Sequence, residues 1–272
     1  MITRHRVNLQ LLLFLYVWCT FGCGTLPNGR GWGQDATLTP GWNRIGQAAR
    51  DAATSPATWG PAAGALAFQV GSADRNLALW AMEHTPVYGS QSNAARASDS
   101  LGSAISAAYV GTALATPSGD DPGEWALSKA KGFAVGYSAV GITSQVTGLL
   151  KDETARTRPN GADNQSFPSN HAMKAGVYAT LASRNLETIP LSGEMISASQ
   201  LFLGSLVAGV SWARLEAGSH YPSDVLAGVA MGHFIGAFIN DAFLGIEKSA
   251  PIVPIIEPSR EGVFFGVTIQ YR

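Results

Sequence analysis

The chain has 272 residues, with 18 Lys and Arg against 19 Asp and Glu. The formal net charge of −1 argues against a general nucleic-acid binder, which needs a broadly basic surface. The length suffices for one large domain or two small ones with a full hydrophobic core. Only 14% of the residues are charged, so we expect the cations to serve a local site.

Residues 1–23 have the pattern of a secretory signal peptide. A positively charged start precedes a mostly apolar run over residues 9–21, which is too short and too quickly interrupted for a membrane span. Gly22 and Cys23 follow and resemble the end of a bacterial lipoprotein signal, in which the cysteine becomes lipidated. We therefore predict lipidation of Cys23 and export to the periplasm or outer cell envelope. Ordinary cleavage nearby, with Cys23 as a bystander, is the alternative.

The remaining cysteine, Cys19, lies inside this signal, so we expect no disulfide and no cysteine-based metal site after export. Residues 24–41 are rich in Gly, Pro, Asn and Thr, a composition that predicts a flexible tether.

From residue 42 onward, apolar periodicity and capping residues predict helices. The expected ranges are 42–53, 56–70, 72–83, 94–115, 124–150, 170–184, 192–213 and 222–243. Polar or charged residues interrupt each one within the roughly 20 residues that a membrane span requires. The sequence therefore predicts an all-α fold, a soluble helical bundle over residues 42–246, with an integral multi-span protein as the alternative.

The tail, residues 247–272, changes its period. Apolar and other residues alternate from Val263 to Tyr271, and an apolar run over 252–256 precedes a turn-forming segment. A period of two is typical of strands, so a short C-terminal β-hairpin is expected.

Three short clusters between residues 151 and 224 carry the chemistry. Together they supply three cations, two histidines and one carboxylate, the groups that a phosphoryl-transfer site without a metal needs. They read Lys151-x6-Arg158-Pro159, Pro168-Ser169-Asn170-His171 and Arg214-x5-His220-x3-Asp224. Alone, each group has an ordinary structural explanation; their conjunction in a chain with few charges favours a site.

The third cluster is suited to nucleophilic catalysis. Pro222 favours the start of a helix, which brings Asp224 about one turn from His220. The carboxylate is then expected to accept the proton on one ring nitrogen and leave the other free to attack phosphorus. We therefore predict His220 as the nucleophile. Alone, such a pair is more often a surface His–Asp contact.

The second cluster is suited to acid–base catalysis. Ser169 is expected to cap the helix that follows it, while the free amides of the first turn face a phosphate. His171, at the mouth of this helix, is our predicted general acid. Lys151, Arg158 and Arg214 are expected to surround the phosphate, Arg through a planar fork and Lys as a point charge.

These clusters resemble the type 2 phosphatidic acid phosphatase superfamily, which includes bacterial class A acid phosphatases and vanadium-dependent haloperoxidases. The family pattern is KxxxxxxRP, then PSGH, then SRxxxxxHxxxD. The resemblance implies a helical-bundle core. It also implies that His220 is the nucleophile, that Asp224 is the partner of His220, and that His171 is the acid–base catalyst. It also implies the following phosphate-binding residues: Lys151, Arg158, Ser169, Asn170 and Arg214.

Two positions depart from the family pattern. Asn170 stands where the family has glycine, so the backbone amide survives and a side chain enters the site. Ala213 replaces the serine before Arg214 and removes a hydroxyl. Neither change deletes a catalytic group. His233 and His84 are not assigned to the site.

The predicted function is a metal-independent phosphatase of the cell envelope that needs no cofactor and acts through a phospho-histidine. Lipid phosphates or diphosphates are the favoured substrates, with soluble phosphate esters close behind. The expected partners are the phosphorylated substrate and, through a lipid anchor, the membrane; no nucleic acid is expected. The alternatives are a vanadium haloperoxidase, which the six-residue gap disfavours, and a non-catalytic anion-binding lipoprotein.

Overall fold

The computed structural model describes residues 22–246 and two further segments, 252–259 and 262–269. In chain order its elements are α2 (Trp42–Thr54), α3 (Pro56–Ala67), α4 (Ala73–His84), α5 (Gln91–Ala115), α6 (Pro122–Thr154), α7 (Asn170–Leu186), α8 (Gly193–Glu216), α9 (Pro222–Ile239), the π-helical turn η1 (Asn240–Leu244), β1 (Ile252–Ser259) and β2 (Gly262–Ile269).

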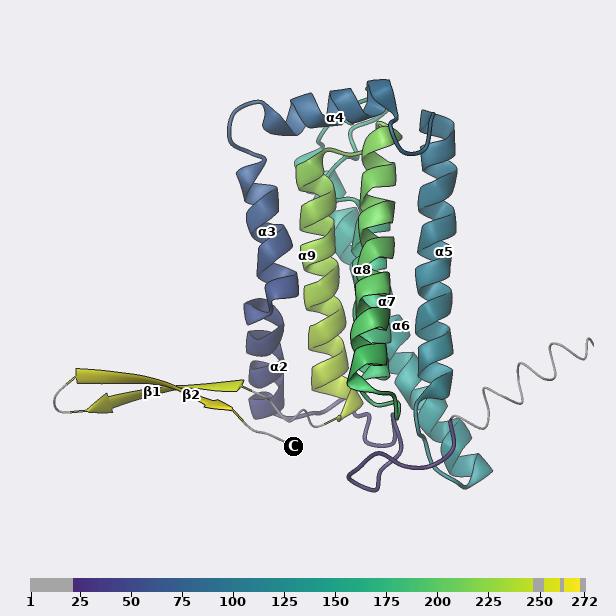
Figure 1. Cartoon of the computed structure of the whole chain (residues 1–272), viewed down its shortest axis with the longest axis vertical. Helices are drawn as coiled ribbons and strands as arrows, with labels where there is room; N and C mark the ends of the chain where they lie inside the picture. The colour runs from purple at the N-terminus through teal and green to yellow at the C-terminus, as the bar shows by residue number, and fades with distance from the viewer. Residues whose placement is uncertain (1–21, 247–251, 260–261, 270–272) are drawn as a thin grey trace, which may run out of the picture.

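The long helices run side by side, and α4 lies across one end of the bundle (Figure 1). Helix α7 is central, because it packs against α5, α6, α8 and α9. Helices α2 and α3 follow each other along the outer side of α9 (Figure 1). The predicted helical bundle is confirmed.

Side-chain caps explain several helix starts. Ser90 accepts a hydrogen bond from the Asn93 amide at 3.1 Å, so α5 begins at Gln91, before the expected start at residue 94. Asp121 caps α6 in the same way, and Pro122 occupies its first position. At its other end, α6 stops where Ala155 adopts a left-handed backbone with φ 42°.

Helices α7 and α9, which carry His171 and Asp224, pack closely against each other. A Cβ atom on Gly232 would lie 2.2 Å from the carbonyl oxygen of Met173, a separation that no side chain tolerates. Glycine at 232 therefore sets the distance between the two helices, and with it the separation of the residues at their ends.

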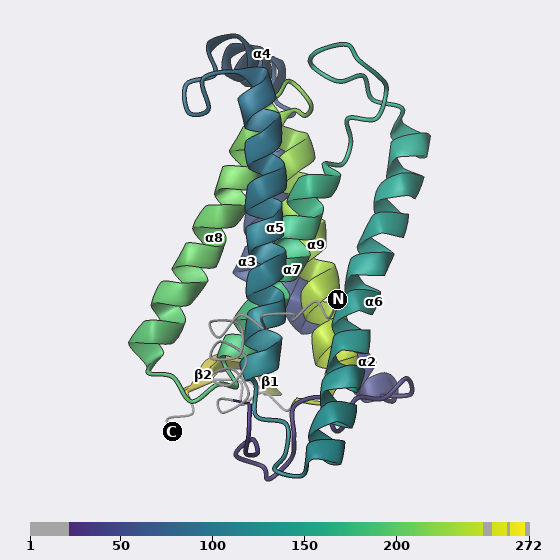
Figure 2. The ribbon, with the colours of Figure 1, turned by 90° about the vertical axis from the view of Figure 1, so that its right-hand side faces the viewer.

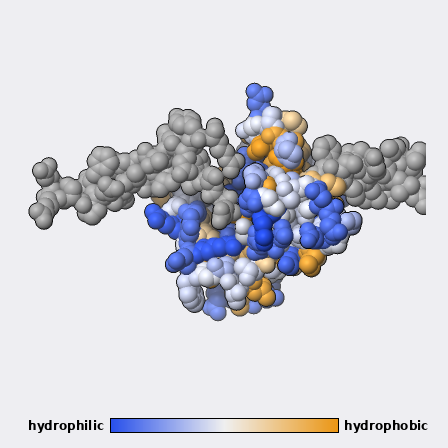
Figure 3. All heavy atoms as spheres, turned by 90° about the horizontal axis from the view of Figure 1, so that it is seen from below, coloured by the Kyte–Doolittle hydropathy of each residue, from blue (hydrophilic) through white to orange (hydrophobic). Residues whose placement is uncertain are grey.

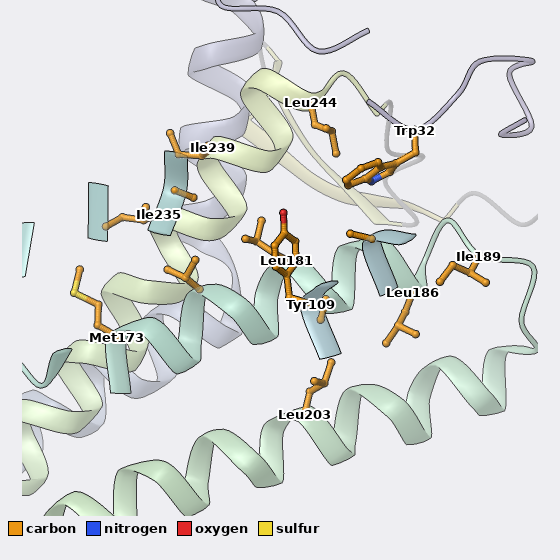
Figure 4. Close-up of a cluster of buried hydrophobic side chains, with 14 residues drawn as sticks. Trp32, Tyr109, Met173, Leu181, Leu186, Ile189, Leu203, Ile235, Ile239 and Leu244 are labelled. Atoms are coloured by element: carbon orange, nitrogen blue, oxygen red, sulfur yellow. The ribbon is translucent and has the colours of Figure 1, made fainter. Parts of the chain in front are cut away.

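The main core lies between α5, α6, α7, α9 and the segment before α2. Figure 4 shows Trp32 turned toward the same interior as Tyr109, Leu181 and Leu244. Trp32 is 1% exposed, and its amide donates to the carbonyl of Pro117 at 2.7 Å. Burial of a tryptophan is a large hydrophobic gain. Residues 24–41 are therefore not a flexible tether, because their tryptophan is part of the domain core.

Three helical segments are long and apolar enough, by length and composition, to cross a membrane: Pro122–Thr154, Gly193–Glu216 and Pro222–Leu244. The expectation that polar residues disqualify every helix as a span is therefore wrong.

Helices α6 and α8 lie on opposite outer sides of the bundle (Figure 2). Leu149 on α6 and Leu201 and Phe202 on α8 are exposed. The end of the molecule opposite α4 is mainly hydrophilic, with separate apolar patches (Figure 3). Exposed apolar side chains therefore lie along the flanks as well as in patches at this end.

The strands β1 and β2 pair in antiparallel fashion, from Ile252 opposite Ile269 to Ser259 opposite Gly262. They occupy the tail in which the alternating pattern was found, and they extend to one side of the bundle (Figure 1).

Candidate active site

The three predicted clusters come together at the end of the bundle that α4 covers. Lys151 lies in the last turn of α6 and Arg214 in the last turn of α8. The α6–α7 loop contacts the loop before α9, where the Asn160 amide donates to the Gly218 carbonyl at 3.1 Å. Figure 2 shows the α6–α7 loop at the same end as α4. Residues that are far apart in the sequence thus lie together at this end of the bundle.

His220 is 2% exposed, and its Nδ1–H donates to the backbone carbonyl of Ser166 at 2.6 Å. A carbonyl oxygen only accepts, so Nδ1 must carry the proton and Nε2 keeps its lone pair. Burial, and then the positive charge of Arg214, lower the pKa of His220 well below its ordinary value of 6.5. The ring is therefore neutral near pH 7, as a nucleophile requires.

The expected direct bond between His220 and Asp224 is not formed. Nδ1 of His220 lies 3.9 Å from Oδ2 of Asp224, too far for a hydrogen bond. The Ser166 carbonyl takes the place of the carboxylate, and the Ser166 hydroxyl donates to Oδ2 of Asp224. Ser166 thus connects the carboxylate of Asp224 to the ring of His220.

Asp224 is fully buried and well supplied with donors. Its Oδ2 accepts from the Ser166 hydroxyl and from the Tyr221 amide, the latter at 2.8 Å. Its Oδ1 accepts from Nη1 of Arg156 at 2.5 Å. Burial raises the pKa of Asp224, and these hydrogen bonds oppose the rise by favouring the carboxylate. The carboxylate is thereby held in one orientation.

His171 lies in the first turn of α7, and its Nε2–H donates to Oδ1 of Asp99 on α5 at 2.9 Å. Burial and the charge of Arg214 lower the pKa of His171, whereas Asp99 raises it. Asp99 thus stabilises the protonated ring, the form that donates a proton. No sequence signal marks Asp99, because it lies 72 residues before its partner.

The three predicted cations crowd together around His220. Burial and the charge of Arg158 lower the pKa of Lys151. The same two causes lower the pKa of Arg214 to about 10. Cations that oppose each other's charge in a partly buried space favour a bound anion. The arrangement suits a phosphate.

Each cation also has a protein contact. Lys151 donates to the carbonyl of Gln165, and Nε of Arg158 donates to Oδ1 of Asp163 at 2.7 Å. Nη1 of Arg214 donates to the Ser98 hydroxyl at 3.2 Å, while its buried Nε has no hydrogen-bond partner among the described residues. An unsatisfied buried donor in a cationic site is suited to a ligand oxygen.

Ser169 and Asn170 lie at the start of α7. Ser169 caps the helix by accepting from the Ala172 amide, and its own amide donates to the Asp224 carbonyl at 3.1 Å. Asn170 is the first helical residue, so the left-handed backbone that glycine allows is not needed there. Its Oδ1 is buried without a hydrogen-bond partner in the described part of the chain.

Three other residues singled out in the sequence lie away from this site. Cys23 is exposed near the start of α6, where the neighbouring Gly24 amide donates to Asp120. His233 shares a hydrogen bond with Thr58 at 2.7 Å, in agreement with a structural role. His84 donates to the carbonyl of Trp80 at 2.9 Å.

Residues 132–245 match the sequence model of a family described as the PAP2 superfamily. No curated protein matches the chain in sequence. Among solved structures, the fold is similar to that of a transmembrane PAP2-type phosphatidylglycerolphosphate phosphatase from Bacillus subtilis. That match has a TM-score of 0.51 and 19% identity, and it covers 67% of this chain and 91% of the other.

The matched region contains all three clusters, from Lys151 to Asp224. The structure brings these clusters together at one end of a helical bundle that a PAP2-type protein shares. Residues 132–245 therefore match the PAP2 superfamily in sequence, and the fold is similar to that of a PAP2-type protein.

Proposed function

We propose that the chain is a metal-independent phosphatase that acts through a phospho-histidine formed on Nε2 of His220. The observation that carries the proposal is the hydrogen bond from His220 Nδ1–H to the Ser166 carbonyl. It leaves Nε2 unprotonated in a site where Lys151, Arg158 and Arg214 gather positive charge.

In the first step, Nε2 of His220 attacks phosphorus and a P–N bond forms. The P–O bond to the leaving group breaks, and protonated His171 gives its proton to the leaving oxygen. In the second step, a water attacks phosphorus while His171 takes its proton. The P–N bond then breaks, its electron pair returns to Nε2, and inorganic phosphate is released.

The proposed substrates are lipid phosphates or diphosphates. Three helices with the length and composition of membrane spans favour association with a membrane, and the solved PAP2-type relative is described as transmembrane. Leu149 is 67% exposed and lies two residues before Lys151, so apolar surface approaches the phosphate site along α6. A lipid can then lie against this flank with its phosphate at the cations.

The protein is further proposed to reside in the cell envelope, held by lipid on Cys23. The sequence pattern around Cys23 and its exposure support this location. Labelled palmitate supplied to expressing cells should be incorporated by the wild type and by Cys19→Ser. Cys23→Ser should lose the label. Equal labelling of both variants would contradict a lipid anchor on Cys23.

The activity is tested by phosphate release from the full-length protein in detergent micelles with a chelator present. The substrates are phosphatidate, phosphatidylglycerol phosphate, a polyprenyl diphosphate and p-nitrophenyl phosphate. We expect release that a lipid substrate supports best, that survives the chelator and that His220→Ala abolishes. His84→Ala is the matched control, because His84 lies outside the site and bonds to its own helix.

A covalently bound phosphate that forms rapidly on the wild-type protein, is labile in acid and stable in base, and is absent from His220→Ala would identify the phospho-histidine. No release from any substrate by a folded protein would refute the phosphatase. Release preserved in His220→Ala would refute the mechanism, and a preference for p-nitrophenyl phosphate would refute the lipid substrate.

A further inference from the structure

Arg156 lies inside the first cluster, between Lys151 and Arg158, yet it does not face the phosphate site as they do. It follows the left-handed Ala155 at the end of α6. Its guanidinium carbon lies 4.1 Å from the centre of the Tyr221 ring. This stacking sets the plane of the guanidinium next to the start of α9.

The two terminal nitrogens of Arg156 bind two different carboxylates. Nη1 donates to Oδ1 of Asp224 at 2.5 Å and to the hydroxyl of Ser223 at 2.8 Å. Nη2 donates to Oδ2 of Asp74 at 2.6 Å. Arg156 therefore joins the carboxylate beside His220 to a carboxylate from α4.

Asp74 is 6% exposed, in the first turn of α4. Its Oδ1 accepts from the Ser223 amide at 2.8 Å, and its Oδ2 accepts from the Ser223 hydroxyl at 2.6 Å. Because an unpaired buried carboxylate is costly, these donors tie α4 to the first turn of α9. Asp74 thus holds Arg156 in a fixed position relative to Asp224.

The orientation of Asp224 bears directly on the nucleophile. With Arg156 on Oδ1, the other oxygen is turned toward the Ser166 hydroxyl and lies 3.9 Å from Nδ1 of His220. Ser166 in turn accepts the Nδ1 proton on its backbone carbonyl. A continuous series of contacts runs from Asp74 through Arg156, Asp224 and Ser166 to His220.

We propose that Arg156 and Asp74 are a pair of positioning residues that hold Asp224 and, through it, the reactive tautomer of His220. This inference deepens the proposed phosphatase function and rests on it for its kinetic test. Both terminal nitrogens of Arg156 are engaged with protein oxygens, so the pair acts on kcat and leaves phosphate binding to the other cations.

Arg156→Met should lower kcat about 10- to 100-fold, the range for displaced or unsupported catalytic groups, with KM changed less than about threefold. Arg156→Lys should recover part of the loss, because a lysine keeps the charge without the fork. Asp74→Asn should lower kcat by about as much as Arg156→Lys does. Arg184→Met is the matched control. Arg184 lies outside the site, and its Nη2 pairs with Oδ2 of Asp241 at a distance of 3.0 Å.

A double-variant comparison tests whether Arg156 acts through Asp224. Adding Arg156→Met to Asp224→Asn should cost less than about twofold in kcat, because the residue it positions is already changed. Independent, multiplicative losses would overturn the proposal. So would a rise in KM with kcat unchanged, which is the result expected if Arg156 bound the phosphate itself.

A measurement that needs no turnover separates this inference from the phosphatase proposal. In full-length protein with 15N-labelled histidine, NMR should show His220 protonated on Nδ1 in the wild type and in Arg184→Met. Arg156→Met should show exchange with the Nε2-protonated form. An unchanged His220 spectrum in folded Arg156→Met would overturn the positioning role, whether or not the wild type releases phosphate.

Discussion

Nδ1 of His220 and Oδ2 of Asp224 lie 3.9 Å apart, with the Nδ1 proton donated to the backbone carbonyl of Ser166. At this distance the carboxylate still stabilises positive charge that develops on the imidazole. The tautomer, however, is set by the backbone carbonyl of Ser166, a residue that Asp224 holds in place through the Ser166 hydroxyl. The two tasks that one aspartate often performs are divided here between Asp224 and Ser166.

This division predicts a moderate effect of Asp224→Asn. We expect kcat to fall about 10²-fold, less than the roughly 10⁴-fold loss that follows when such a substitution leaves the histidine in the wrong tautomer. Steady-state phosphate release measures the effect, and Arg184→Met is the control, because Arg184 pairs with Asp241 and lies outside the site. A loss as large as that of His220→Ala would contradict the role of the Ser166 carbonyl.

Burial of neutral His220 predicts a loss of stability in acid. Its pKa in the folded protein is lowered below the ordinary 6.5, so the unfolded chain binds more protons below that pH. The free energy of unfolding should therefore fall as the pH drops from about 6.5 toward the folded-state pKa. Urea unfolding at several pH values measures this dependence.

In that experiment His220→Gln should show a weaker dependence on pH, because the titrating group is gone. His84→Gln should keep the wild-type slope, since His84 is exposed at the end of α4. Identical slopes for the wild type and His220→Gln would show that other groups control the acid sensitivity.

The buried position of Trp32 predicts that residues 24–41 contribute to stability. Trp32→Ala should lower the free energy of unfolding by about 3–5 kcal/mol, the usual cost of emptying a core aromatic site. Trp42 is 86% exposed, so Trp42→Ala should change stability by less than about 0.5 kcal/mol. Denaturant unfolding of both variants tests this prediction. Equally small effects of the two substitutions would support a flexible tether over residues 24–41.

The contact between α7 and α9 predicts that Gly232 is needed for both fold and activity. A Cβ at this position meets the Met173 carbonyl at 2.2 Å, so Gly232→Ala should cost at least about 2 kcal/mol. Since α7 and α9 carry His171 and Asp224, kcat should fall as well.

Gly141→Ala is the matched control for this substitution. Gly141 lies inside α6, where an added Cβ would have no atom within 4 Å among the described residues other than the helix's own backbone. Alanine there should stabilise the protein by about 0.5–1 kcal/mol, because it restricts the unfolded chain and suits a helix. Thermal unfolding and phosphate release of the two variants are compared. A neutral Gly232→Ala would mean that the helices can move apart without loss.

Much of the helical architecture could be predicted from local sequence. Ser192 and Asp121 mark helix starts because their side chains satisfy the free amides of the first turn. Pro222 marks the start of α9 for a related reason. The spacing of Lys151 and Arg158 was informative because an active site needs both charges at one phosphate.

The prediction from local sequence was wrong for residues 24–41, which we expected to be a flexible tether. Their Gly- and Pro-rich composition is typical of a linker, but composition does not report whether one large side chain finds a cavity. Trp32 packs over Gly132, where an added Cβ would lie 2.1 Å from its ring. A contact between residues a hundred positions apart has no local signature.

The sequence by itself determined the helices, their capping residues and the set of groups at the site, because these depend on side-chain type and short spacing. Only the tertiary structure decided which groups touch. It placed the Ser166 carbonyl on His220, Asp99 on His171 and Asp74 on Arg156. A backbone acceptor carries no residue identity, and a carboxylate 82 positions from its arginine becomes its partner only when packing buries both.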